Sequence, residues 1–205
     1  MNLDDPIIFV IDDDYRMREA LSSLVEAMGF RVATFGSASE FLNTERPDSP
    51  ACLILDLELP DINGLELQQE LANRGSSPVI FVTGHGDISS SVRAMKAGAV
   101  EFLSKPFGEQ ELQSAIERAL SIDRLARQKG SELAELQSRY SLLTPREQEV
   151  LPFVVEGFLN KQTAADLGTS EVTIRVHRGQ IMRKMGAGSL AELVRMADKL
   201  GVTPR

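Results

Sequence analysis

The chain has 205 residues, of which 42% are hydrophobic and 25% are charged, and its formal net charge is −8. This composition is typical of a soluble globular protein, and no run approaches the roughly 18 apolar residues of a membrane-spanning helix. The stretch MNLDDPIIFV lacks the basic residues that precede the apolar part of a secretory signal. The single cysteine, Cys52, excludes an internal disulfide framework and fits a reducing compartment, so we expect a cytoplasmic protein without a membrane partner.

The charge is distributed unevenly along the chain. Residues 1–120 hold 9 Lys and Arg against 20 Asp and Glu, residues 121–140 hold 4 against 3, and residues 141–205 hold 9 against 7. An acidic front part and a mildly basic end predict two modules with different partners. We therefore expect a domain over residues 1–120, a helical linker over 121–140 and a second domain over 141–205.

Strand-like and helix-like segments alternate through the first domain. Apolar runs typical of strands are Ile7–Ile11, Arg31–Phe35, Cys52–Leu55, Val79–Thr83 and Val100–Leu103. The segments between them have helical periodicity, as in MREALSSLVEAMG, which Gly29 ends. This alternation predicts an α/β domain with a parallel sheet covered on both faces, in which ligands bind at the carboxyl ends of the strands.

Polar residues end or follow four of the five apolar runs. Asp12 and Asp13 follow the first run, Asp56 the third and Lys105 the fifth, while Thr83 ends the fourth. We expect these side chains to meet at one edge of the sheet. Carboxylates placed close together repel one another unless a cation joins them, and Mg²⁺ prefers such oxygen ligands. The sequence therefore predicts a Mg²⁺ site, with Mn²⁺ as the alternative ion.

The same residue types predict phosphoryl transfer. An aspartate can attack phosphorus, so we assign Asp56 as the phosphoacceptor, with Asp12 and Asp13 holding Mg²⁺. Lys105 and the Thr83 hydroxyl would bind phosphoryl oxygens. Each residue alone has a simpler interpretation: the aspartates as a helix cap, Thr83 as a strand-end hydroxyl and Lys105 as a solvated lysine. The complete set carries the prediction.

The stretches VIDDD, LDLELPDINGLEL, FVTGHGDI and EFLSKPF resemble the receiver domain of bacterial two-component response regulators over residues 6–120. The resemblance implies a flavodoxin-like (CheY-like) fold with a parallel five-stranded sheet of order 2-1-3-4-5. It also implies phosphorylation of Asp56 by a sensor histidine kinase, with the main-chain carbonyl of Glu58 as a further metal ligand beside Asp12, Asp13 and Asp56. Thr83 would be the switch hydroxyl, and Phe102 the aromatic residue that turns inward after phosphorylation.

The second domain contains clear helix-capping signals. Thr144-Pro145-Arg146-Glu147 and Ser189-Leu190-Ala191-Glu192 both have the sequence of a capping box. Glycines that would end helices follow at positions 157, 168, 186 and 201. These signals predict four helices, of which the middle two, residues 161–167 and 171–185, are joined by a tight turn. That spacing is typical of a helix-turn-helix.

Helical periodicity divides the residues of the second middle helix between two faces. Ile174, His177, Ile181 and Met185 form the stripe that we expect to face the core. The residues predicted to face DNA bases are Thr173, Arg175, Val176, Gly179, Gln180 and Arg183. Those predicted to contact phosphates are Asn160, Lys161, Arg178 and Lys184. The simpler alternative is a solvated basic helix.

The stretches LTPREQEVL, GFLNKQTAADLG and EVTIRVHRGQIMRKM resemble the LuxR-type helix-turn-helix of the NarL/FixJ regulators, and TGHGDI and KAGAVEFLSKPF favour the FixJ-like branch. The resemblance implies a transcription regulator, an activator rather than a repressor, that binds double-stranded promoter DNA and works with RNA polymerase. The small net charge of residues 141–205 predicts weak binding by one copy, so we expect a homodimer on phosphorylation.

Two other functions remain open from the sequence. A phosphatase of the haloacid dehalogenase type would use the Asp-x-Asp spacing of Asp12-Asp13-Asp14, but Arg16 stands where Thr or Val is expected, and the second domain would be unexplained. A helix-turn-helix regulator that does not depend on phosphorylation is the second alternative. We expect no enzyme activity other than the phosphoryl chemistry at Asp56. The linker is helical in composition, and Gly130 is its expected weak point.

Overall fold

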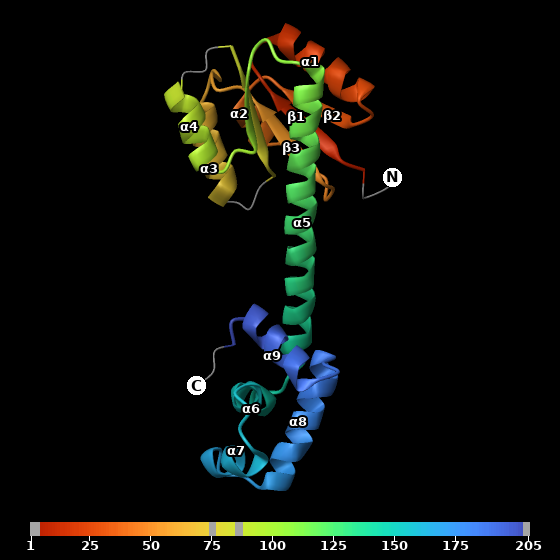
Figure 1. The fold of residues 1–205 in the computed structure, drawn as a ribbon, viewed down its shortest axis with the longest axis vertical. Coiled ribbons are helices and arrows are strands. Elements are labelled where there is room, and N and C mark those ends of the chain that lie inside the picture. The colour runs from red at the N-terminus through yellow and green to blue at the C-terminus, as the bar shows by residue number, and fades with distance from the viewer. Residues whose placement is uncertain (1–4, 74–76, 85–87, 203–205) are drawn as a thin grey trace. The chain divides into compact units, whose positions relative to one another are not determined.

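The computed structural model describes residues 5–73, 77–84 and 88–202 (Figure 1). The chain divides into two compact units, Met1–Arg127 and Gln128–Arg205, which are described separately. Among the described residues, no helix has the length and apolar character needed to cross a membrane.

The first unit is a parallel five-stranded sheet of order β2-β1-β3-β4-β5, as the sequence predicts. Its strands are β1 (Ile7–Ile11), β2 (Arg31–Phe35), β3 (Ala51–Leu55), β4 (Val79–Thr83) and β5 (Glu101–Ser104). The helices that follow them are α1 (Tyr15–Ala27), α2 (Ala38–Leu42), α3 (Gly64–Asn73), α4 (Ile88–Lys96) and α5 (Glu109–Ser141). The predicted third and fifth strands each begin one residue away from the observed start.

The two faces of the sheet are covered by different helices (Figure 1). Along β1, Phe9 packs in the cluster that includes residues of α2, α3 and α4, whereas its neighbours Ile8 and Val10 pack with residues of α1 and α5. This alternation follows from the two-residue period of a strand. The central strands are buried on both faces, which explains why their sequences read as continuous apolar runs rather than alternating ones.

Helix α5 is continuous from Glu109 to Ser141 and includes Gly130, the expected weak point. Asp123, near its middle, anchors it to the sheet of the first unit. Asp123 accepts a hydrogen bond from the N–H of Ala51, the first residue of β3, at 3.0 Å, and also one from Arg127 at 2.8 Å. These contacts explain why the first unit extends to Arg127.

The described part of the second unit contains four further helices, as the sequence predicts, around one apolar core. They are α6 (Pro145–Val155), α7 (Asn160–Asp166), α8 (Glu171–Met185) and α9 (Leu190–Lys199). Thr144 and Glu147 form the predicted capping box of α6, which includes Pro152 without ending there. The prediction for Ser189 was only half right. Ser189 caps α9, but the Glu192 carboxylate accepts from the N–H of Gly188 instead of Ser189.

Candidate functional site

An acidic cluster lies at the carboxyl ends of β1 and β3, where the sequence places it. The register pairs Ile11 with Leu55, and the N–H of Asp56 donates to the Ile11 carbonyl at 2.9 Å. Asp12 and Asp56 therefore follow the ends of two neighbouring strands and lie side by side. One carboxylate oxygen from each of Asp12, Asp13 and Asp56 lies within 4.8 Å of the others.

Lys105 joins two members of this cluster. Its Nζ atom donates to Asp12 Oδ2 at 2.8 Å and to Asp56 Oδ2 at 2.9 Å, and the Lys105–Pro106 peptide bond is cis. Burial acts to lower the pKa of Lys105, but the hydrogen bonds to the two aspartates outweigh it and raise that pKa. The lysine is therefore held in its charged form between the carboxylates.

The cluster has the chemistry of a site for a hard divalent cation. Asp12 is only 2% exposed, and burial raises the pKa of its carboxyl group because the charged form is poorly solvated. Asp13 is exposed. Three carboxylates at this spacing are oxygen ligands of the kind that Mg²⁺ prefers, and the ion would keep several waters or take up phosphoryl oxygens. The residues therefore fit the group that the sequence predicts.

Asp14 has the simpler role that the sequence left open for this acidic run. It is the N-cap of α1, and its side chain accepts from the N–H of Arg16 at 2.9 Å. The run is thus divided, since Asp12 and Asp13 lie in the cluster whereas Asp14 caps the helix.

Thr83 lies at the end of β4, the strand next to β3, and Phe102 lies on β5, the edge strand beyond it. Thr83 is 1% exposed, and its main-chain carbonyl accepts from the N–H of Lys105 at 2.8 Å, which ties the ends of β4 and β5 together. Phe102 is half-buried, with its ring centroid 6.1 Å from that of Phe81. The next part of the loop after β4, His85-Gly86-Asp87, belongs to the stretches that carried the resemblance and lies outside the described residues.

Main-chain groups of the loop after Asp56 lie close to Asp56 itself. The N–H of Glu58 donates to Asp56 Oδ1 at 3.3 Å. A Cβ atom at Gly64 would lie 2.3 Å from the main-chain oxygen of Asp56, so no larger residue fits at that position without a shift of the backbone. The sequence alone did not predict this contact.

Asp61 is a second residue of this loop that sequence reasoning missed. Its carboxylate accepts from the main-chain N–H groups of Ala38 and Ser39 and from the Ser39 hydroxyl, at 3.2, 2.8 and 2.6 Å. The Ser39 hydroxyl is the main cause that lowers the pKa of Asp61. The Asp56 loop is thereby fastened to the start of α2. In the sequence, the Pro60-Asp61 pair indicates a turn. It does not indicate what Asp61 binds, because Ala38 and Ser39 lie more than twenty residues away along the chain.

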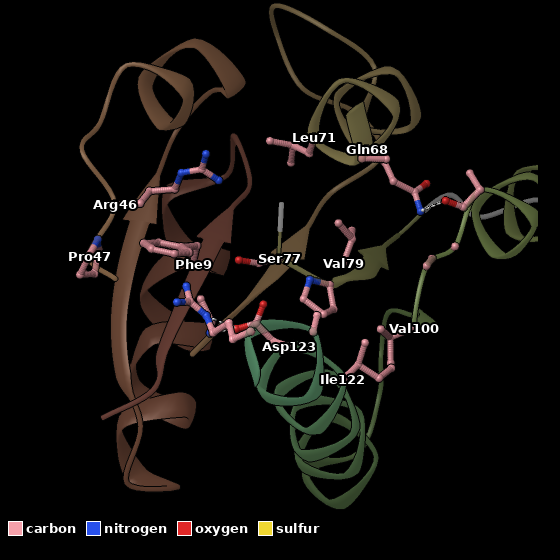
Figure 2. A pocket seen from close by; sticks show the side chains of 18 of the residues that line it. Phe9, Arg46, Pro47, Gln68, Leu71, Ser77, Val79, Val100, Ile122 and Asp123 are labelled. Carbon is pink, nitrogen blue, oxygen red and sulfur yellow. Dashed lines mark hydrogen bonds and ion pairs between the residues drawn. The ribbon is translucent and has the colours of Figure 1, made fainter. Parts of the chain in front are cut away.

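A separate hollow of about 890 Å³ lies where β3 and β4 begin, opposite the acidic edge (Figure 2). Phe9, Leu71 and Val100 contribute apolar walls, and its charged residues include Asp123 and Arg127. These two side chains are paired with each other at 2.8 Å. None of the predicted site residues lines this hollow, so the acidic cluster remains the candidate site.

The predicted DNA-facing residues of the second unit divide into two groups. Ile174, Ile181 and Met185 of α8 are buried, as predicted, and His177 is half-buried. Of the residues predicted to contact DNA, the exposed ones are Lys161 of α7 and Arg175, Val176, Gly179 and Arg183 of α8. The half-buried ones are Asn160, Thr173, Arg178, Gln180 and Lys184.

Two of the half-buried cations have partners inside the second unit. Arg178 Nη1 donates to the Phe158 carbonyl at 2.8 Å, and Lys184 Nζ donates to Glu147 Oε2 at 2.6 Å. Glu147 is itself 4% exposed. The sequence predicts phosphate contacts for these two cations, and helical periodicity did not predict these partners inside the unit.

The two units match separate families of known proteins. Residues 8–117 match the response regulator receiver domain, and residues 141–197 match the bacterial regulatory proteins of the luxR family. The chain is 42% identical over 198 residues to the transcriptional regulatory protein FixJ of Azorhizobium caulinodans, which covers 96% of this chain and 94% of that protein. The chain belongs to the FixJ-like response regulators.

This response regulator is also similar to nodulation protein W of Bradyrhizobium diazoefficiens. The identity is 48% over 198 residues, or 96% of this chain and 87% of that protein. The solved structure of the response regulator StyR is 47% identical and has a TM-score of 0.83, covering 95% of this chain and 99% of the other. The response regulator thus belongs to a family of DNA-binding transcription regulators and not to a family of catalytic enzymes, which argues against the phosphatase alternative.

Proposed function

We propose that Asp56 accepts a phosphoryl group from the phosphohistidine of a sensor histidine kinase, and that this step controls promoter binding by the second unit. The observation that carries the proposal is the cluster of Asp12, Asp13 and Asp56 within 4.8 Å of one another, with Lys105 donating to two of them. It combines a nucleophile, ligands for a cation and one fixed positive charge.

The chemical step needs mainly alignment and charge neutralisation. A carboxylate oxygen of Asp56 attacks phosphorus while the bond from phosphorus to the histidine nitrogen breaks and its electron pair stays on the imidazole. Asp12, Asp13, Asp56 and the main-chain carbonyl of Glu58 would hold Mg²⁺, or Mn²⁺ in its place, and the bound ion neutralises charge on the phosphoryl oxygens. Lys105 exchanges a carboxylate partner for a phosphoryl oxygen.

The switch follows from the new charge on Asp56. The Thr83 hydroxyl donates to a phosphoryl oxygen, which draws the end of β4 toward Asp56 and lets Phe102 turn inward from its half-buried position. This is a local change in charge that biases an element with two arrangements. The surface that is remodelled includes α4 and β5, and we infer that it supports a homodimer.

The second unit then binds double-stranded promoter DNA in the cytoplasm and activates transcription with RNA polymerase. Thr173, Arg175, Val176, Gly179, Gln180 and Arg183 face the bases, and Asn160, Lys161, Arg178 and Lys184 lie toward the phosphates. The exposed position of Arg175 and Val176 on α8 supports this assignment. We assign residues 1–120 to the receiver domain, 121–140 to the linker and 141–205 to the DNA-binding domain.

The test compares wild-type protein with Asp56→Asn. Each is incubated with Mg²⁺ and acetyl phosphate, and its mass, its oligomeric state and its binding to DNA selected from a random pool are measured. Wild-type protein should gain one phosphoryl group, dimerise and bind the selected DNA more tightly, whereas Asp56→Asn should do none of these. Equal DNA binding by both proteins would support the regulator that does not depend on phosphorylation.

A further inference from the structure

Arg18 of α1 binds the main chain of both residues of the acidic pair. Its Nη1 atom donates to the Asp12 carbonyl at 2.7 Å and to the Asp13 carbonyl at 2.9 Å. Because the donor is charged, these hydrogen bonds are stronger than neutral ones. A positive charge in the first turn of a helix opposes the helix dipole, so the position of Arg18 is explained by its partners and not by helix stability.

The guanidinium group is confined on two further sides. Its Cζ atom lies 5.7 Å from the centre of the Tyr15 ring. A Cβ atom at Gly36 would lie 3.5 Å from Nη1, so this glycine borders the space that the guanidinium occupies. The confinement favours the rotamer in which Arg18 reaches both carbonyls.

The two carboxylates of the acidic pair are held in different ways. The Asp12 side chain accepts from Lys105 at 2.8 Å and from the N–H of Asp14 at 2.9 Å. Within the described part of the chain, the Asp13 carboxylate makes no hydrogen bond or ion pair. No partner in that part of the chain therefore fixes this carboxylate, and its position depends on the main chain from which it projects, where Arg18 binds the Asp13 carbonyl.

We propose that Arg18 is a positioning residue for the divalent cation, which fixes the Asp13 carboxylate through its backbone before the ion arrives. The inference rests on the proposed function, because it takes the acidic cluster as the Mg²⁺ site. Groups that orient metal ligands without touching the ion commonly change metal affinity by ten- to a hundredfold when removed.

The sign of the expected effect separates positioning from simple electrostatics. Removing a positive charge near an acidic site should strengthen cation binding, since it removes repulsion. Loss of positioning should weaken it. The matched control is Arg16→Met, which removes the same charge from an exposed residue of the same helix turn.

Isothermal titration calorimetry with Mg²⁺ on the full unphosphorylated chain measures the effect directly. Arg18→Met should raise the Mg²⁺ dissociation constant about tenfold. Arg18→Lys should raise the dissociation constant less, because an ammonium keeps a charged donor but lacks the planar set of N–H donors of a guanidinium. Arg16→Met should bind as tightly as wild type or more so. With acetyl phosphate, Arg18→Met should need more Mg²⁺ for half-maximal phosphorylation and keep its rate at saturation.

Three outcomes overturn an assignment. If Arg18→Met binds Mg²⁺ as tightly as the wild type, or lowers only the melting temperature, the positioning role is wrong. An equal weakening in Arg16→Met has the same consequence. Should Arg18→Met not fold, the dissociation constant of Arg18→Lys decides in its place. If neither the wild type nor Asp13→Asn binds Mg²⁺, the metal site of the proposed function is wrong, and the loss of binding is not caused by the change at Arg18.

Discussion

Lys105 Nζ donates a hydrogen bond to Asp56 Oδ2 at 2.9 Å, so the proposed phosphoacceptor already has a cationic partner. Because Lys105 also binds Asp12, its ammonium lies between two carboxylates that would otherwise repel each other. We infer that the approach of a phosphoryl group replaces one of these partners by another oxygen anion, at little cost in reorganisation.

The first prediction concerns this lysine. Lys105→Met removes a donor that is aimed at the reacting oxygens, and the loss of such a donor in enzymes lowers reaction rates by about a hundred- to a thousandfold. The initial rate of phosphorylation by acetyl phosphate at saturating Mg²⁺ should fall by a similar factor. Lys96→Met, which changes an exposed lysine of α4, is the control and should keep the wild-type rate. A normal rate in Lys105→Met would remove this lysine from the mechanism.

The second prediction concerns Gly64. Gly64→Ala places a Cβ atom 2.3 Å from the Asp56 carbonyl oxygen, so the backbone must shift. Overpacking of this kind costs about 1–3 kcal/mol, and here it also displaces the phosphoacceptor. We expect a lower melting temperature together with slower phosphorylation. Gly108→Ala, where a Cβ atom meets nothing within 4 Å, should change neither measurement.

The third prediction is a dependence of stability on pH. Burial acts to raise the pKa of Glu147, but hydrogen bonds from Lys184 and Thr144 outweigh it and hold the pKa below its ordinary value of 4.5. A carboxylate with a lowered folded-state pKa contributes stability that is present above its unfolded-state pKa and is lost as pH falls through the folded-state value. Glu147→Gln should therefore lower the melting temperature at about pH 7.

The difference between wild type and Glu147→Gln should disappear as pH falls well below that ordinary value. Melting curves recorded over this pH range measure it. Glu149→Gln is the matched control, since this exposed glutamate of the same helix pairs with Arg146 only at the surface. A difference that stays constant with pH would mean that the charge of Glu147 is not what stabilises α6.

The fourth prediction separates two arginines of α8. The Arg175 side chain is 69% exposed, whereas Arg178 donates to the Phe158 carbonyl at 2.8 Å. Arg175→Ala should cost about 1–3 kcal/mol in DNA binding and leave the melting temperature unchanged. Arg178→Ala should lower both. Fluorescence anisotropy with the selected DNA and thermal unfolding measure the two effects. Wild-type DNA affinity in Arg175→Ala would contradict the assigned recognition face.

The sequence predicted those parts of the fold that depend on neighbouring residues. Apolar runs located the strands, and the rule that parallel strands end at one edge brought Asp12 next to Asp56. Contacts between distant segments were not predictable in this way. The partners of Lys184 and Asp61, and the close approach of Gly64 to Asp56, depend on how loops and helices pack. Composition and periodicity do not encode that packing.

Local signals were also insufficient where two nearby groups compete. The Ser189 sequence has the spacing of a capping box, but the Glu192 carboxylate is taken by the N–H of Gly188. Gly130 lies within the helical backbone of α5, and the weak point that its low propensity predicts stays a prediction. Helix propensity is a small contribution that neighbouring turns override.

Helices of the second unit are capped by side chains that are close in sequence, as by Thr144 and Ser189. The receiver instead pairs strands that are distant in sequence, and Ile7 pairs with both Arg31 and Ala51. Contacts of short range form quickly during refolding, and parallel strand pairing is slow. We therefore expect two kinetic phases after dilution from denaturant. In the interval between them, the DNA-binding helices would exist without a finished receiver to control them.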